Sequence, residues 1–265
     1  MMLLLEGGKF PFHFLGQENP SFFEHNKRRS KKSYHTFENN KVLSFGERLN
    51  LQEQNESMTP KQSYNSLLAQ KVIKELKSRN IQGFYFETKE EALRKVLEIV
   101  PKNSTVSWGG SITLHEIGLL DALKKGEYNV LDASDRSKGG DEMNRIAHEA
   151  LNSDYYFLSA NAISASGELI NMDGIGNRVA ALIYGPKNVI VIAGINKVEL
   201  NLDLAINRAK TIAAPLGVLD YNKNVSTFEE LLDKAQGISS QMVITTMSVF
   251  KDRVKVILVG EPLGY

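Results

Sequence analysis

The pattern of apolar and polar positions becomes regular from about residue 58. Thr59 can cap a helix, Pro60 occupies its first position, and Gln62 can complete a capping box. The apolar positions that follow at spacings of three and four predict one buried helix face: Tyr64, Leu67, Leu68, Val72 and Leu76. Asn80 can end this helix in the left-handed conformation.

The same succession of capping signal, apolar stripe and short extended run continues along the chain. Thr88 and Glu91 form a second capping box, and Pro101 ends the helix that they begin. We expect strands at residues 81–86, 105–108, 128–132, 155–159 and 189–193. We expect further helices after Ser111 and over residues 141–151 and 200–212. This alternation predicts an α/β fold with a mainly parallel sheet and helices on both of its faces.

The last part of the chain shows a different pattern. Residues 241–248 and 253–259 are rich in β-branched side chains, and a short turn with Lys251 and Asp252 separates them. This spacing predicts a C-terminal antiparallel hairpin that is added late to the sheet.

Residues 1–57 lack a sustained helical or strand period, so we divide the chain into an N-terminal tail, 1–57, and an α/β domain, 58–265. The tail holds seven of the twelve Phe residues, too many for a purely disordered segment. We therefore expect parts of it to dock on the domain or on another subunit, which leaves a homo-oligomer open. The basic run within residues 27–32 is more typical of a solvated charge run than of a patch for nucleic acid or anionic lipid.

Composition narrows the function classes. The chain has 265 residues, no Cys, and 32 basic against 31 acidic residues. Without Cys it can form no disulfide, thiolate nucleophile or Cys-ligated zinc or iron–sulfur cluster, so we expect no cofactor of its own. The balanced charge indicates no nucleic-acid partner. The longest apolar runs are too short to cross a membrane and residues 1–5 lack the flanks of a secretory signal, which predicts a cytoplasmic protein.

A glycine turn between a predicted strand and a predicted helix is the first place that could carry chemistry. Gly109 and Gly110 allow a tight turn, and the free N–H groups of the helix start favour a carboxylate or phosphate there. Ser111 and Thr113 add hydroxyl donors. A plain glycine turn with Ser111 as an ordinary N-cap explains the same residues equally well.

A polar segment with two glycines is the second such place. Arg178 can donate two hydrogen bonds to a carboxylate or phosphate, and Asp173 or Asn177 can orient it. The alternative is a tight turn with an Asp–Arg surface pair. Gly174 and Gly176 lack the third glycine of the dinucleotide fingerprint, so this segment does not predict an NAD site.

The loops at the carboxyl ends of parallel strands converge on one crevice, which would bring Gly109, Asn161 and Asp173 together. The C-terminal segment is the third place, because Glu261 could act as a general base, although a surface cap is the favoured interpretation. The two His-Glu pairs are adjacent in sequence and lack the i, i+4 spacing of metal ligands, so no metal site is expected.

These segments together resemble the LUD domain of lactate utilization proteins, from about residue 60 to residue 265. The resemblance is carried by residues 108–111, 161–163, 167–169, 173–180, 195–197 and 259–265. It implies the fold of the superfamily that contains sugar-phosphate isomerases, CoA transferases and formyltetrahydrofolate cyclo-ligase. It also implies participation in the oxidation of L-lactate to pyruvate, where a LUD subunit works beside iron–sulfur subunits.

This chain departs from many relatives because residues 211–240 contain no cysteine cluster. Thr227 and Glu230 predict a capped helix in that stretch instead. The chain would therefore be the cofactor-free member of a lactate-oxidising complex, with iron–sulfur subunits as partners.

Three hypotheses follow. The leading one is a non-redox LUD subunit that binds a small anionic metabolite, such as a hydroxy or keto acid, and supports lactate oxidation. The second is a stand-alone transferase or isomerase for a CoA ester or phosphorylated metabolite, with Glu168 or Glu261 as acid/base. The third is an interaction protein that works through its tail. The predicted ligand-binding residues are Gly109, Gly110, Ser111, Thr113, Asn161, Asp173, Gly174, Gly176, Asn177, Arg178 and Glu261.

Overall fold

The computed structural model describes residues 37–38, 41–42, 58–221 and 224–265. The chain divides into two units between Ser57 and Met58, and each is described by itself. In the first unit, β1 (Phe37–Glu38) and β2 (Lys41–Val42) form an antiparallel pair. The predicted basic run and the predicted docking of the tail lie outside the described residues.

A six-stranded sheet forms the centre of the second unit. Its strands are β3 (Gln82–Phe86), β4 (Thr105–Trp108), β5 (Asn129–Leu131), β6 (Tyr155–Leu158), β9 (Asn188–Gly194) and β12 (Val254–Val259). Their order is β3-β12-β9-β6-β4-β5, and every neighbouring pair is parallel. The predicted α/β fold with a mainly parallel sheet is confirmed.

Helices cover both faces of this sheet. The helices concerned are α3 (Pro60–Ser78), α4 (Lys89–Ile99), α5 (Ile112–Glu116), α6 (Leu119–Lys125) and α8 (Asn177–Tyr184). Consecutive strand residues point to opposite faces: Val189 and Val191 of β9 join the core formed with α3 and α8, whereas Ile190 and Ile192 join the core formed with α4, α5 and α6. Because both faces are buried, the central strands read as continuous apolar runs.

The predicted helix starts are present at the predicted residues. The Thr59 hydroxyl accepts from the Gln62 N–H at 3.3 Å, and the Gln62 side chain accepts from the Thr59 N–H at 2.9 Å. Thr88 and Glu91 make the same reciprocal pair at the start of α4. Asn80 adopts a left-handed conformation with φ 57°, as expected.

The buried face of α3 differs from the predicted one. Tyr64 and Leu67 are 56% and 66% exposed, whereas Ala69, Val72 and Leu76 are fully buried. The predicted apolar stripe is therefore wrong for the first two turns of the helix, where these two side chains remain at the surface.

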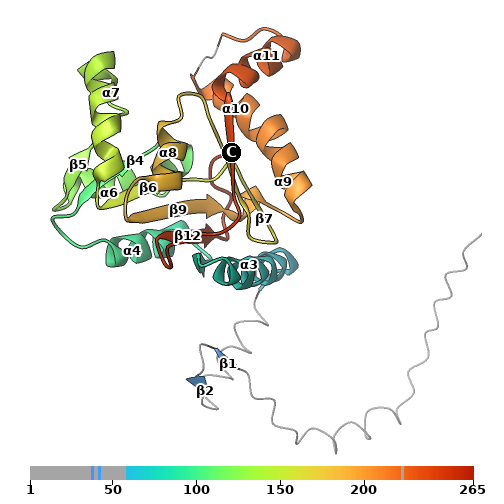
Figure 1. The fold of residues 1–265 in the computed structure, drawn as a ribbon. Coiled ribbons are helices and arrows are strands. Elements are labelled where there is room, and N and C mark those ends of the chain that lie inside the picture. Colours follow the sequence, from blue (N-terminus) through green and yellow to red (C-terminus); the bar gives the residue numbers. More distant parts are fainter. Residues whose placement is uncertain (1–36, 39–40, 43–57, 222–223) are drawn as a thin grey trace, which may run out of the picture. The chain divides into compact units, whose positions relative to one another are not determined.

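A second, four-stranded sheet was not predicted. It contains β7 (Ala162–Ser164), β8 (Leu169–Asp173), β10 (Val198–Glu199) and β11 (Gln241–Thr245) in the order β10-β7-β8-β11. The helices packed on it are α9 (Leu202–Arg208), the π-helical turn η4 (Ala209–Ala213), α10 (Ala214–Tyr221) and α11 (Phe228–Ile238). These helices are grouped together in orange beside β7 in Figure 1.

The predicted C-terminal antiparallel hairpin is wrong. β11 pairs antiparallel with β8 in the smaller sheet, whereas β12 enters the larger sheet between β3 and β9 and pairs parallel with both. The physical reason lies in β12 itself: Val256 and Leu258 face one helical layer, and Ile257 and Val259 face the other. A strand that is apolar on both faces is stabilised in the interior of a covered parallel sheet.

The remaining elements complete the unit. They are η1 (Arg136–Lys138), α7 (Gly140–Glu149), η2 (Ala150–Asn152) and η3 (Ile195–Lys197). Among the described residues, no helix combines the length and the apolar character that a bilayer crossing requires.

Candidate functional site

A cleft of about 990 Å³ opens where β4, β6 and β9 end at their carboxyl edges. Because β5 and β6 lie on opposite sides of β4, the order of the strands reverses at β4, and ligands of α/β proteins bind at such a reversal. The predicted residues that line the cleft are Gly110, Ser111, Asn161, Asp173, Gly174, Asn177 and Arg178.

Arg178 joins the separate loops of the cleft. A Cβ atom on Gly109 would lie 2.7 Å from Cγ and Cδ of Arg178, so this glycine makes room for the arginine side chain. The guanidinium donates to the carbonyl of Gly110 and to Oδ1 of Asn161, both at 3.4 Å, and to the carbonyl of Met172. The expected convergence of the loops after β4, β6 and β8 is therefore organised by one side chain.

Asp173 holds the start of the helix that carries Arg178. Its Oδ2 accepts from the N–H of Arg178 at 3.1 Å and from that of Val179 at 3.2 Å. These N–H groups have no acceptor within the helix. The same oxygen lies 3.9 Å from Nε of Arg178, and the two side chains are only 11% and 17% exposed. The pair is thus part of the cleft wall rather than a surface pair.

Lys197, at the end of η3, is a cleft residue for which the sequence predicted no role. It is 3% exposed, and its Nζ donates to Oγ1 of Thr113 at 2.9 Å and to Oγ of Ser159 at 3.0 Å. Burial, followed by the positive charges of Arg208 and Arg178, lowers the pKa of Lys197 to about 7, against an opposing effect of Glu116. The available signal was position, because this lysine follows the buried strand β9 almost directly.

Arg208 contributes a further buried positive charge beside Lys197. It is 5% exposed and donates to the carbonyl of Asn161 at 2.6 Å and to that of Asn196 at 3.1 Å. Burial lowers the pKa of Arg208, and Glu199 at 3.9 Å acts in the opposite direction. Its hydrogen bonds hold together the two loops that carry Asn161 and Lys197.

The other charged groups of the cleft are paired more closely. Nζ of Lys124 lies 2.8 Å from Oδ2 of Asp132, and the side chain of Tyr265 forms a hydrogen bond with that of Asp220. In the part of the chain that the structure describes, no carboxylate lies within 4.0 Å of Nζ of Lys197. The Lys197 amine is therefore a cation at the cleft that no described carboxylate contacts, which favours an anion beside it.

Two of the remaining predicted residues contact the cleft indirectly. Thr113 is buried behind Lys197 and accepts its hydrogen bond. Gly176 lies in a neighbouring pocket of about 540 Å³ formed with residues of α7. A Cβ atom on Gly176 would lie 2.7 Å from Oε1 of Gln241, and the φ of Gly176 is +98°. Both observations explain a glycine at this position by geometry.

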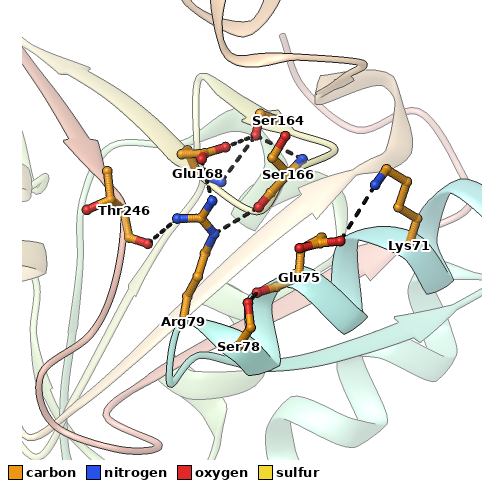
Figure 2. A network of polar contacts seen from close by, with 8 residues as sticks. All are labelled: Lys71, Glu75, Ser78, Arg79, Ser164, Ser166, Glu168 and Thr246. Carbon is orange, nitrogen blue, oxygen red and sulfur yellow. Dashed lines mark hydrogen bonds and ion pairs between the residues drawn. The ribbon is translucent and has the colours of Figure 1, made fainter.

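Neither candidate acid/base glutamate lines the cleft. Glu261 accepts from the N–H of Lys89 at 3.2 Å, at the start of α4, which is the capping role that was favoured for it. Figure 2 shows that Glu168 is turned toward Arg79 and Ser164, with both of which it hydrogen-bonds. The predicted ligand contact of Glu261 therefore has no support in the geometry, and the stand-alone transferase or isomerase loses its proposed residues.

No group of three or more His, Asp or Glu side chains is placed to hold a metal ion within the described ranges. The single tryptophan, Trp108, lies in the cleft wall, 3% exposed, with Nζ of Lys124 5.5 Å from its ring centre. Its fluorescence is therefore placed to report on cleft occupancy.

The sequence model of the LUD domain matches residues 69–259 of this chain. Among curated proteins, none matches the chain significantly. Among solved structures, a DUF162 family protein from Deinococcus radiodurans is similar, with 13% identity and a TM-score of 0.47 over 74% of this chain and 98% of that one. A second similar structure is eIF2B delta from Chaetomium thermophilum, with 21% identity and a TM-score of 0.31 over 46% of this chain and 54% of that one.

Proposed function

Because the chain belongs to the LUD domain family, we propose that it binds a small 2-hydroxy or 2-oxo acid in its cleft and acts as a non-redox subunit in the oxidation of L-lactate to pyruvate. The observation that carries the proposal is that Arg178 and Lys197 both line the cleft, and that the Lys197 amine has no carboxylate within 4.0 Å among the described residues. A carboxylate placed beside Lys197 would meet a positive charge that no described carboxylate contacts.

Arg178 has donor capacity to spare for such a ligand. A guanidinium has five N–H groups. The hydrogen bonds of Arg178 to described residues use one from Nη1 and both from Nη2, so Nε and the second Nη1 hydrogen have no acceptor among them. These two N–H groups lie on different edges of the guanidinium, so each can donate one hydrogen bond to an oxygen of an anionic ligand.

The cleft is larger than a three-carbon acid requires. A volume of about 990 Å³ is at the upper end for small-molecule sites. It can hold the acid at its floor and leave its mouth to a second group. In a lactate-oxidising complex that group would belong to a partner that carries the electron acceptor, because this chain has no Cys to ligate a cluster.

Titration of the isolated protein with L-lactate and with pyruvate, followed by Trp108 fluorescence and by calorimetry, tests the binding step. We expect saturable binding that Arg178→Gln weakens by about tenfold or more, the usual effect of losing charged hydrogen bonds. Arg145→Gln is the matched control, because Arg145 is 62% exposed on α7 and pairs only with Glu142 and Glu149 among described residues. Absence of binding by either acid, or equal affinity in Arg178→Gln, would refute the proposed site.

Gentle affinity purification from the native host grown on lactate tests the assembly step. We expect co-purifying subunits with the visible spectrum of iron–sulfur clusters, and dye reduction by lactate that the isolated chain does not catalyse. A colourless protein that purifies alone would contradict the role in a complex, while the titration would still decide the binding site.

A further inference from the structure

The Lys197 amine has surroundings that are unusual for a buried lysine. Buried lysines are rare and are normally paired with a carboxylate. Here Nζ has two hydroxyl partners, on Thr113 and Ser159, and no carboxylate within 4.0 Å among the described residues. The residue nevertheless lines the cleft, so the amine is buried in protein yet next to the space that a ligand would occupy.

We propose that Lys197 is a covalent site, whose amine condenses with the carbonyl carbon of a 2-oxo acid held by its carboxylate at Arg178. This inference rests on the proposed function, because the same carboxylate site positions the acid. It goes further in two respects: it selects 2-oxo acids over 2-hydroxy acids as reactive ligands, and it gives the chain chemistry of its own.

The reaction needs no co-reactant beyond the acid. The lone pair of the neutral amine forms a C–N bond to C2, the C=O π bond opens, and a proton moves from nitrogen to the C2 oxygen to give a carbinolamine. The C2 hydroxyl then leaves as water with a second proton, and a C=N bond forms. One amine and one 2-oxo acid thus give one imine and one water, and no oxidant or reductant takes part.

The surroundings favour each requirement of this step. An ordinary lysine is neutral in less than about one molecule in a thousand at pH 7. Burial and the charges of Arg208 and Arg178 bring the pKa of Lys197 to about 7, so a large fraction of the amine is available as a nucleophile. The two flanking hydroxyls fix Nζ at 2.9 and 3.0 Å and can relay the protons that the step moves.

Position in the fold supports the same assignment. Lys197 follows β9 and Ser159 follows β6, so the amine and one of its hydroxyl partners come from the carboxyl ends of two neighbouring strands. Gly264, of the C-terminal segment, lies against the amine, because a Cβ atom there would be 3.2 Å from Nζ and 2.5 Å from Oγ1 of Thr113. The amine is thus surrounded by residues from several separate segments rather than by one loop.

Borohydride trapping is the experiment that tests the inference. The full-length protein is incubated with pyruvate, reduced with sodium borohydride, and digested for peptide mapping by mass spectrometry. We expect one reduced three-carbon acid on the peptide that contains Lys197, none with L-lactate, and none in Lys197→Met. We expect Arg178→Gln to lower the labelled fraction by about tenfold or more.

Matched controls separate the two proposals. Lys187→Met removes an exposed lysine and should leave the labelling of Lys197 unchanged. Mapping of the wild-type chain needs no variant, so it decides the matter even if Lys197→Met fails to fold. Labelling absent from Lys197, or spread evenly over surface lysines, overturns the imine. If pyruvate still binds by calorimetry in that case, the proposed function stands; if neither acid binds, both fail.

Discussion

The buried amine of Lys197 should make the stability of the domain depend on pH in a direction that most proteins do not show. The pKa of Lys197 is about 7 in the folded chain, against an ordinary value of 10.5. Between these two values the unfolded chain binds a proton that the folded chain does not. The free energy of unfolding therefore rises with pH across this window, and below pH 7 the penalty is fully present and constant.

The size of the effect follows from the same two values. Each pH unit inside the window changes the free energy of unfolding by about 1.4 kcal/mol. From pH 7 to pH 9.5 the wild-type chain should gain about 3 kcal/mol from this group alone. Lys197→Met removes the penalty, about 4 kcal/mol at pH 7, and also two hydrogen bonds to hydroxyls, each worth about 1 kcal/mol. We expect the variant to be more stable than the wild type by about 2 kcal/mol at pH 7.

Urea unfolding followed by Trp108 fluorescence, at pH values from 6.5 to 9.5, measures this. The single buried tryptophan reports on the α/β unit without a signal from residues 1–57. The informative quantity is the difference between wild type and Lys197→Met, because titrations common to both cancel; Lys187→Met supplies the lysine control. A difference that stays flat between pH 7 and pH 9.5 would refute a lowered pKa, and with it the account of the cleft floor.

Three further changes have defined outcomes. L-lactate at the floor should raise the pKa of Lys197, so binding at pH 7.5 takes up protons, which calorimetry in buffers of different ionisation enthalpy detects and Lys197→Met abolishes. Gly109→Ala places a Cβ atom 2.7 Å from the Arg178 side chain, which must move away. Lactate affinity in fluorescence titrations should therefore fall by about tenfold or more. Thermal stability should change little, because the arginine side chain is flexible. Arg79→Met leaves Glu168 buried without its cation and should lower the free energy of unfolding in urea by about 2–3 kcal/mol, whereas replacing both residues by Met should recover at least half of that loss.

Those parts of the fold that depend on a few neighbouring residues could be predicted from the sequence. The capping boxes at Thr59 and Thr88 involve partners three residues away, and at the left-handed stop the Asn80 N–H donates to the carbonyl of Lys77. Residues 105–108 are a strand with the predicted bounds. Local chemistry decides such features, because the groups that satisfy each other are close in the chain before any tertiary contact forms.

The second sheet could not be predicted because its contacts are distant and because β7 and β8 lack the usual pattern of a strand, although β11 lies within the predicted run 241–248. β7 has three residues, and β11 pairs with β8 from about seventy residues further along the chain. Asn171 places a polar side chain in the middle of β8, fully buried, where its Nδ2 donates to the Ser159 carbonyl at 2.9 Å. A polar residue at that position breaks the apolar pattern from which a strand is read.

Part of the site could be predicted from residue types alone. The role of Lys197 could not, because it depends on the lack of a nearby carboxylate, which the sequence does not show. Gly109, Asn161 and Arg178 attract notice as residue types, and the structure joins them around one guanidinium. Lys197 differs from other lysines only through its three-dimensional surroundings. Thr113 of α5 and Ser159 after β6 bring hydroxyls, and Arg208 of α9 brings a positive charge. No carboxylate lies within 4.0 Å of its Nζ among the described residues. The argument that loops at the carboxyl ends of parallel strands converge on one cleft also applies to β9, and it would have selected Lys197.

One titrating group then connects the predictions. Lys197 is the cleft residue whose surroundings bring its pKa to about 7, so we expect the proton exchanged on anion binding near neutrality to be its own. The pH at which the stability difference begins to rise, the pH range of proton uptake with lactate, and the reactivity of the amine toward pyruvate all depend on the same free energy of protonation. Ligand-free stability and proton uptake must therefore give the same pKa. If they disagree, the group that responds to the anion lies elsewhere in the cleft, and peptide mapping after borohydride reduction alone decides the covalent assignment.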